Sequence, residues 1–81
     1  MKHKYNISLE QYDELYIEQN GCCAICKKPE NELKKILCVD HNHKTNKVRG
    51  LLCDKCNRGL GYFNDNIIFL NNAGNYLSLN D

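Results

Sequence analysis

The chain has 81 residues, a net charge of +1 and six cysteines. This length predicts one domain with a modest apolar core, which in small proteins is often reinforced by disulfides or a metal. The N-terminus is polar rather than a secretory leader, and no apolar run approaches the length of a membrane span. We therefore expect a cytoplasmic protein without a membrane segment, whose cysteines are largely thiolates.

The first predicted element is a helix over about 8–20. Ser8 is a favourable N-cap, and Gln11 stands at the third helical position, as in a capping box. Ile7 and Tyr12 have the spacing of a hydrophobic staple. We expect this helix to supply core and to pack against the cysteine-rich segment that follows it.

Two short apolar runs, 36–39 and 48–52, predict an antiparallel hairpin. Cys38 lies in the first run, where a lone cysteine is most often a buried core residue. In the turn between the runs, Asn46 is suited to a left-handed backbone conformation. A helix is expected over about 54–61, directly after the second run.

A last helix is predicted over about 65–78. Asn64 or Asp65 could cap its N-terminus, since both residue types accept hydrogen bonds from the first helical turn. Five side chains at helical spacing are expected to face inward: Phe69, Leu70, Ala73, Tyr76 and Leu77.

Four of the six cysteines form two Cys-x-x-Cys pairs, Cys23 with Cys26 and Cys53 with Cys56, separated by 26 residues. Two residues between thiolates let both sulfurs reach one tetrahedral ion, which predicts one structural zinc closed by four sulfurs. The long gap between the pairs has room for the hairpin. Cys22 is not needed as a ligand, because the paired set is complete without it. Two disulfides, or four free thiols, are the alternative.

A second polar cluster, Asp40-His41-Asn42-His43, follows the first apolar run. Strand alternation puts the two histidines on one face and Asp40 on the other, so a shared metal requires a bend here. A carboxylate suits Mg²⁺, and an imidazole that titrates near neutrality can take a proton from water. The alternatives are a solvated polar turn, or a second zinc site that uses the histidines.

Positive charge is unevenly distributed along the chain. Residues 1–26 carry two lysines against four acidic residues, whereas residues 41–58 carry a single acidic residue against five basic ones: Lys44, Lys47, Arg49, Lys55 and Arg58. A basic face around a site is what phosphate binding requires, although ordinary surface scatter would give a similar pattern. A nucleic-acid backbone is one partner that such a face would suit, and these five side chains are then the candidate contacts.

Three segments carry a resemblance to a known family. Val39-Asp-His-Asn-His43, followed by Val48-Arg-Gly-Leu-Leu-Cys-Asp-Lys-Cys-Asn57 and by Leu60-Gly61, resembles the recombination endonuclease VII family. That family is a branch of the HNH, or ββα-metal, nucleases and is known largely from phages. The likeness runs over about 16–77 and is most specific over 23–57.

The resemblance implies a DNA endonuclease that hydrolyses phosphodiester bonds. Asp40 and Asn57 would bind a divalent cation, Mg²⁺ or Mn²⁺, and His41 would be the general base. His43 would orient the phosphate or assist the metal site. The four cysteines of the two pairs would hold the structural zinc.

The fold implied by the resemblance is α+β. One domain would cover residues 1–81, with a zinc-stapled ββα-metal (His-Me finger) core over about 22–62 and a helix on either side. DNA is the expected partner, and the expected location is the cytoplasm of a phage's bacterial host. Whether the chain forms a homodimer, or a complex with phage recombination or packaging proteins, is left open. Family members that resolve junctions carry a further C-terminal region, so nicking or nonspecific cleavage is the expectation here, with double-strand and branched-DNA cleavage left open. The alternatives are a noncatalytic zinc module that binds nucleic acid or protein, and a nuclease subunit that requires a partner.

Overall fold

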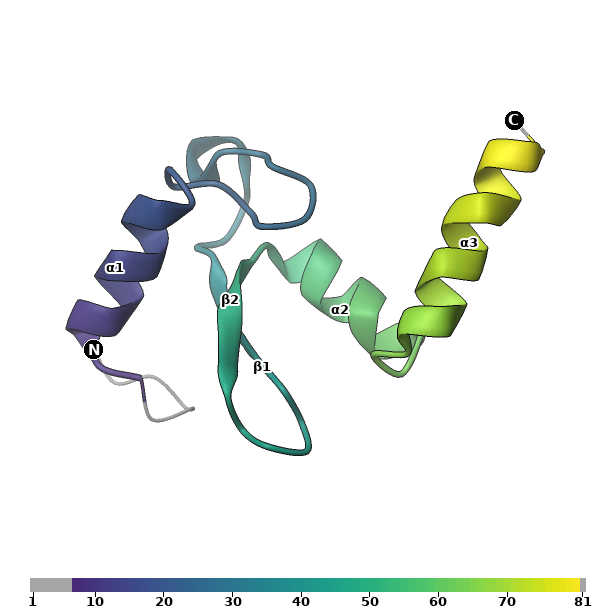
Figure 1. Cartoon of the computed structure of the whole chain (residues 1–81). Coiled ribbons are helices and arrows are strands. Elements are labelled where there is room, and N and C mark those ends of the chain that lie inside the picture. Colours follow the sequence, from purple (N-terminus) through teal and green to yellow (C-terminus); the bar gives the residue numbers. More distant parts are fainter. Residues whose placement is uncertain (1–6, 81) are drawn as a thin grey trace.

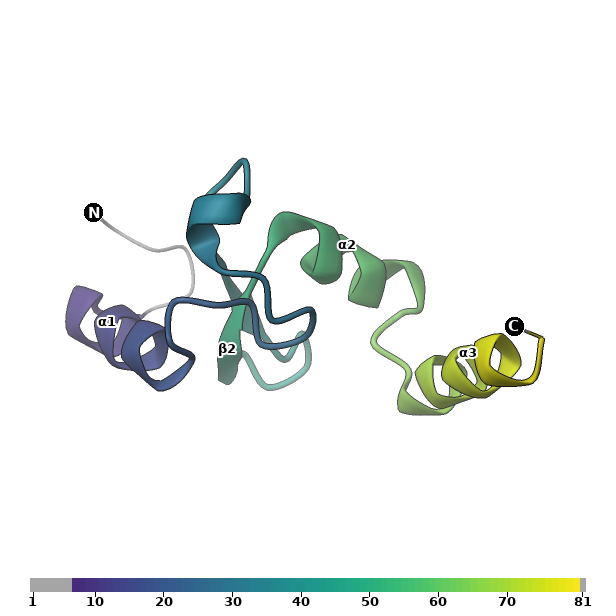
Figure 2. The same cartoon turned by 90° about the horizontal axis from the view of Figure 1, so that it is seen from above.

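The computed structural model describes residues 7–80 and has an α+β fold. Its elements, in chain order, are α1 (Leu9–Glu18), the 3-10 turn η1 (Glu30–Glu32), β1 (Cys38–His41), β2 (Val48–Leu52), α2 (Asp54–Tyr62) and α3 (Ile67–Leu79). The hairpin of β1 and β2 lies between α1 and α2, and α3 is at the far end (Figure 1). The view from above shows the same order, from α1 through the hairpin and α2 to α3 (Figure 2). The molecule measures 43 × 30 × 20 Å along its principal axes. Within residues 7–80, none of the helices combines the length and apolar character that crossing a membrane requires.

Helix α1 begins at the predicted capping box. Ser8 Oγ accepts a hydrogen bond from the Gln11 amide at 3.0 Å, and Gln11 Oε1 accepts one from the Ser8 amide at 2.9 Å. Ile7 and Tyr12, the predicted staple residues, both belong to the buried core. The helix ends at Glu18, two residues before the predicted boundary.

Gln19, directly after α1, joins this helix to the hairpin. Its Nε2 donates to the carbonyl oxygens of Cys22 at 2.8 Å and Leu51 at 2.9 Å, and its Oε1 accepts from the Leu51 amide at 2.9 Å. The side-chain amide therefore pairs with the edge of β2 as a short backbone segment would. A Cβ on Gly50 would lie 3.1 Å from this Oε1, so glycine there leaves room for the contact.

The first strand starts two residues later than predicted. Ile36 is 55% exposed and precedes the strand, whereas Leu37 and Val39 are buried. Cys38 lies between these inward-facing residues and is half-buried. The expectation that Cys38 is a buried core residue is therefore wrong, because alternation directs its side chain to the other face.

The buried apolar core is small and continuous with the cysteine pairs. The Tyr12 hydroxyl donates to the Leu37 carbonyl at 2.7 Å, which ties α1 to the start of β1. Two core members, Cys23 and Cys53, come from the two Cys-x-x-Cys pairs. The complete described set is Ile7, Tyr12, Cys23, Leu37, Val39, Leu51, Leu52 and Cys53.

Helix α3 is capped by Asn66, whose Oδ1 accepts from the Phe69 amide at 3.0 Å. The predicted caps, Asn64 and Asp65, instead form the preceding turn, with φ of 54° and 55°. This conformation is uncommon for residues other than glycine, but asparagine and aspartate tolerate it best. The turn separates α2 from α3 and changes the direction of the chain.

The prediction that α3 buries one face is wrong. Tyr76 is 66% exposed, and no residue of α3 is buried. The helix extends away from the hairpin, with its first turn closest to the rest of the chain (Figure 1). The residues expected inward that are not buried are Phe69, Leu70, Ala73, Tyr76 and Leu77.

Gln19→Glu is expected to lower the free energy of unfolding by about 1–3 kcal/mol, because a carboxylate cannot donate to the carbonyls of Cys22 and Leu51. Urea denaturation in a buffer that contains zinc, monitored by circular dichroism, measures this change. Glu18→Gln alters the exposed neighbour and is the matched control, expected to stay within about 0.5 kcal/mol. Equal unfolding midpoints for the two variants would contradict the role of Gln19.

Candidate metal centre and active site

The four cysteines of the two pairs meet in one cluster. The sulfurs of Cys23, Cys26, Cys53 and Cys56 all lie within 4.8 Å of one another. The Cys26 and Cys53 sulfurs are 3.8 Å apart, which is far from a disulfide bond of about 2.05 Å. Four sulfurs bound tetrahedrally to zinc at about 2.3 Å would be separated by about 3.8 Å. The cluster therefore has the ligand type and spacing of a zinc site, as predicted.

Backbone groups support both cysteine pairs. The Ile25 amide donates to the Cys23 sulfur, and the Cys56 amide donates to the Cys53 sulfur, both at 3.4 Å. Cys53 is also the N-cap of α2, so its sulfur lies at the positive end of that helix. The first pair is tied to the hairpin by the Ala24 amide, which donates to the Leu51 carbonyl at 3.1 Å.

The thiols of the cluster differ in acidity. Burial opposes ionisation of Cys23, but hydrogen bonds from the backbone of Cys53, Cys26 and Ile25 lower the pKa of its thiol to about 6. Burial, with hydrogen bonds to the neighbouring cysteines, raises the pKa of Cys56 to about 12. Four adjacent thiolates repel one another, and a divalent cation among them would relieve that repulsion.

The other two cysteines lie apart from this cluster. Cys22 and Cys38 are half-buried, and neither belongs to the four-sulfur group. The Cys22 sulfur contacts the Asn20 carbonyl at 3.3 Å instead. Among residues 7–80, no other set of three or more His, Cys, Asp or Glu side chains is grouped to hold a metal.

Asp40 is a buried carboxylate that is paired with an arginine. Its residue is 7% exposed. Arg49 donates to both of its oxygens, from Nε at 2.8 Å and from Nη2 at 2.9 Å. The same Nη2 lies 3.3 Å from an Asp65 oxygen, so one guanidinium joins two carboxylates. The hydrogen bond to Asp40 raises the pKa of Arg49, which keeps this group charged.

The register of the hairpin changes beside Asp40. Asp40 lies opposite Gly50, whereas His41 lies opposite Val48, so Arg49 is an extra residue on β2. An extra residue of this kind bends the strand locally and redirects side chains. A bend here is the condition under which Asp40 and His41 can serve one metal, because a regular strand places them on opposite faces.

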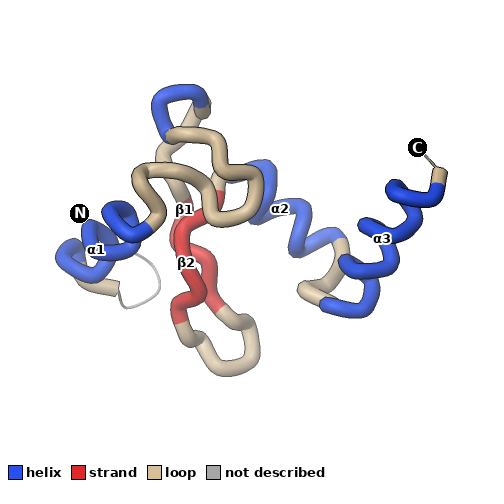
Figure 3. Tube along the Cα trace, turned by 45° about the horizontal axis from the view of Figure 1, so that its top comes forward, coloured by secondary structure: helices blue, strands red, loops and turns tan. Residues whose placement is uncertain are grey.

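His41 is the last residue of β1, and His43 lies in the loop that joins β1 to β2. This loop is at the free end of the hairpin (Figure 3). The rings of His41 and His43 meet edge to face, with centroids 4.8 Å apart. The Asn42 side chain between them accepts from the amides of Lys44 at 2.8 Å and Thr45 at 3.1 Å, which fixes the turn. His43 Nε2 lies 3.5 Å from an Asp65 oxygen, so His43 also meets the acidic turn.

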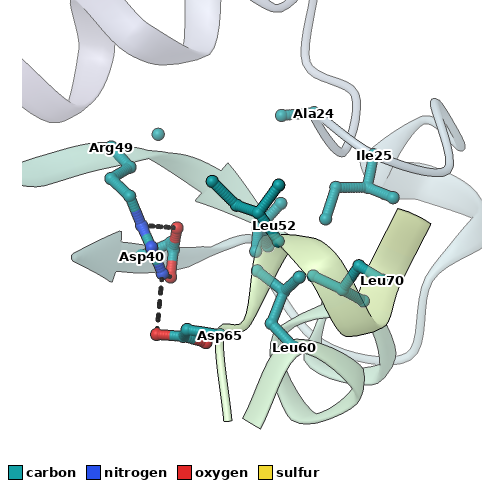
Figure 4. Close-up of a pocket in the computed structure, with 10 residues that line it drawn as sticks. Ala24, Ile25, Asp40, Arg49, Leu52, Leu60, Asp65 and Leu70 are labelled. Carbon is teal, nitrogen blue, oxygen red and sulfur yellow. Dashed lines mark hydrogen bonds and ion pairs between the residues drawn. The ribbon is translucent and has the colours of Figure 1, made fainter. Parts of the chain in front are cut away.

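A cavity of about 310 Å³ lies beside the Asp40–Arg49 pair. Figure 4 shows Asp40, Arg49 and Asp65 at one side of it and apolar side chains at the other. Ile25 comes from the first cysteine pair, and Leu70 comes from α3. The apolar lining consists of Ala24, Ile25, Leu52, Leu60, Ile67 and Leu70.

Asn57 lies in the first turn of α2, directly after Cys56. Its amide donates to the Cys53 carbonyl at 2.9 Å, which fixes its backbone next to the sulfur cluster. The residue is half-buried. Within the described chain, Asp40 lines the cavity but His41, His43 and Asn57 do not. The structure thus brings Asp40 together with Arg49 and Asp65, while the joint role of Asp40, His41 and Asn57 stays a prediction.

The five basic residues predicted to contact DNA have different surroundings. Lys44, Lys47 and Lys55 are exposed. Arg58 pairs with Asp54 at 3.0 Å on the surface of α2. Arg49 is bound to Asp40 and is thus engaged within the protein.

Asp65 and Gln19 are two examples of polar residues whose contacts the sequence does not reveal. Asp65 reads as a helix cap, because it precedes an apolar helix, but its carboxylate contacts Arg49 and His43. Gln19 reads as an ordinary helix-end residue, although it binds Leu51 across 32 positions of the chain. Contacts between such distant positions leave no local signal in one sequence.

These features define a class of protein: a small α+β domain in which a ββα unit carries a four-cysteine cluster at the start of its helix. The sequence model of one family, described as recombination endonuclease VII, matches residues 1–79. The chain belongs to the recombination endonuclease VII family, as the sequence resemblance predicts.

Two curated relatives come from mycobacteriophages. The chain is 47% identical to the Gene 59 protein of Mycobacterium phage L5 over 74 residues, which is 90% of this chain and 44% of that protein. It is 46% identical to the Gene 59 protein of Mycobacterium phage D29 over 74 residues, with the same two shares. The chain thus spans less than half the length of these relatives. No solved structure matches it significantly.

Cys26→Ser and Cys56→Ser are expected to abolish tight zinc binding, because each removes one of four thiolate ligands. Cys22→Ser and Cys38→Ser are the matched controls and should retain zinc, since neither sulfur belongs to the cluster. Elemental analysis of the purified variants measures the metal. Equal zinc content in all four variants would contradict the assignment of the ligands.

Proposed function

We propose that this chain is a metal-dependent DNA endonuclease that hydrolyses phosphodiester bonds. The observation that carries the proposal is the family match over residues 1–79. The positions of Asp40 and His41 on a hairpin, directly before a cysteine-capped helix, support it. Because the chain spans 44% of its phage relatives, the reaction is proposed for this domain and not for the longer proteins.

The four-cysteine cluster is proposed to hold one structural zinc. The sulfur spacing supports this assignment, because the 3.8 Å separation of Cys26 and Cys53 matches tetrahedral thiolate coordination. Four protein ligands leave no open position for water, so this metal would organise the fold and take no part in the reaction. Asn57 follows Cys56 directly, so the same metal would also position Asn57.

Asp40 and Asn57 are proposed to hold Mg²⁺ or Mn²⁺. A carboxylate and an amide oxygen are hard donors that suit either ion. Both Asp40 oxygens are hydrogen-bonded to Arg49, and each retains a second lone pair, so the donor set fits a cation once Arg49 yields space. When bound, the ion would neutralise the negative charge that develops on the phosphate and on the leaving oxygen.

His41 is proposed to be the general base. It is the last residue of β1 and is half-buried. An imidazole nitrogen can accept a proton from an attacking water. An imidazole is neutral over much of the physiological pH range, which this role requires. His43 is 68% exposed in its side chain and contacts the His41 ring, which supports a role in orienting the phosphate.

DNA contacts are proposed for the five basic residues of the hairpin and α2: Lys44, Lys47, Arg49, Lys55 and Arg58. The exposure of the three lysines supports this, since a free ammonium can approach a phosphate without breaking an ion pair. Such contacts position the nucleic acid without reading its sequence.

A noncatalytic zinc module that binds nucleic acid is the second candidate. The bidentate pairing of Asp40 with Arg49 favours it, because a carboxylate that serves only as an internal ion pair has no need of a metal. The two candidates differ in one result, which is cleavage of DNA that depends on a divalent cation and on His41.

His41→Ala is expected to lower the rate of supercoiled plasmid nicking by about 10²–10⁴-fold, the range of a lost general base. Agarose gels in Mg²⁺, in Mn²⁺ and in EDTA measure the rate, with zinc content and circular dichroism as checks of folding. His3→Ala is the control, because His3 is the histidine of the sequence that lies outside the Asp40–His43 segment. Retained cleavage by purified His41→Ala would contradict the base, and inactive, folded wild type would favour the binding module.

Lys55→Ala is expected to weaken DNA binding and to reduce the slope of log K against log salt by about 1, because a phosphate contact releases counterions. Fluorescence anisotropy with a labelled DNA duplex measures the affinity at several salt concentrations. All variants also carry His41→Ala, so that the duplex is not cut during the measurement. Lys34→Ala removes an exposed lysine outside the basic set and is the control. Equal slopes for both variants would contradict a phosphate contact at Lys55.

A further inference from the structure

The Asp40–Arg49–Asp65 bridge, which is the guanidinium of Arg49 with its two carboxylate partners, joins the hairpin to the turn before α3. Arg49 meets Asp40 at 2.8 and 2.9 Å but meets Asp65 at only 3.3 Å. The Asp40 side chain is 9% exposed, against 20% for Asp65. Arg49 is thus held mainly by the more buried carboxylate, with a weaker second partner beside it.

Arg49 reaches Asp40 because of the irregular register of the hairpin. It is the extra residue of β2, inserted between the positions that face Asp40 and His41. A regular strand would alternate Arg49 with Gly50 across the two faces. The local bend instead places the guanidinium on both oxygens of the carboxylate, in the fork geometry that arginine favours.

A divalent cation and Arg49 would compete for Asp40. A buried carboxylate needs a positive partner, and its charge is costly without one. A cation bound to both Asp40 oxygens would repel a guanidinium at the same place. Asp65 lies next to the same nitrogen of Arg49, so the guanidinium has a second anion within reach when it leaves Asp40.

We propose that Arg49 is an exchangeable counter-cation of the metal-binding carboxylate: it neutralises Asp40 until a divalent ion displaces it toward Asp65. Arg49 is therefore a positioning residue, and Asp65 is the site that receives it. The inference rests on the proposed function for the role of Asp40. It adds two residues, Arg49 and Asp65, that set how much divalent ion the domain requires.

The experiment is a Mn²⁺ titration of zinc-loaded protein without DNA, in which electron paramagnetic resonance measures the free ion. Arg49→Lys keeps the charge but loses the two-pronged contact. We expect it to lower the dissociation constant for Mn²⁺ about tenfold, which corresponds to about 1.4 kcal/mol. Lys35→Arg exchanges the cation of the Lys35–Asp54 pair, which lies outside the proposed DNA contacts, and is the control, expected to leave the constant unchanged.

Two further variants test the carboxylates. Asp40→Asn is expected to remove the Mn²⁺ site, while Asp65→Asn should raise the dissociation constant, because Arg49 then has Asp40 as its remaining partner. If Asp65 acts through Arg49, this increase shrinks in the Arg49→Lys background, which a double-mutant cycle measures. An equal increase in both backgrounds would overturn the role of Asp65.

Unchanged Mn²⁺ affinity in Arg49→Lys, an equal shift in Lys35→Arg, or wild-type affinity in Asp40→Asn would overturn the proposal. Plasmid nicking, run in parallel, reports on the proposed function separately. An Arg49-dependent Mn²⁺ site in a protein that does not cut DNA would support the exchange and contradict the nuclease. DNA cleavage by a protein whose Mn²⁺ affinity is the same with and without Arg49 would support the nuclease and contradict the exchange.

Discussion

The meeting of the two cysteine pairs is the contact on which the remaining elements depend. The pairs are separated by 26 residues that contain the whole hairpin, yet their sulfurs lie within 4.8 Å of one another. Cys23 and Cys53 are also core residues. A structural zinc in zinc-finger peptides contributes on the order of 10–16 kcal/mol, which matches the entire stability of a small domain, about 5–15 kcal/mol. In a chain with so few buried side chains, a metal here would decide whether the hairpin forms.

Local signals account for most of the secondary structure. The capping box at Ser8 and the left-handed Asn46, with φ of 63°, form as predicted, because each depends on neighbouring residues alone. The start of β1 and the exposure of α3 were not predictable in this way. Apolar periodicity shows that a helix has an apolar side, but it carries no information about whether another element covers that side.

The candidate site also contains one part that local sequence predicts and one part that depends on distant residues. Its cysteine cluster follows from spacing, since one tetrahedral ion explains both pairs. The pairing of Asp40 with Arg49 does not, because it depends on an irregular register between two strands. Asp65 reaches Arg49 across 16 positions, through a turn in which Asn64 and Asp65 both have positive φ. A single sequence records neither the register nor the direction of that turn.

The four-cysteine cluster and the Asp40 carboxylate differ in how their negative charge is neutralised. Four thiolates are soft ligands that favour zinc, whereas the Asp40 carboxylate is a hard ligand that favours Mg²⁺ or Mn²⁺, so the two kinds of ion would not exchange sites readily. Among the described residues, the four sulfurs have one another as neighbours, and a metal would neutralise them as thiolates, whereas Asp40 is already paired with Arg49. If Asp40 holds a divalent ion as proposed, this carboxylate would release the ion without being left as an unpaired buried charge, because Arg49 would take the place of the ion.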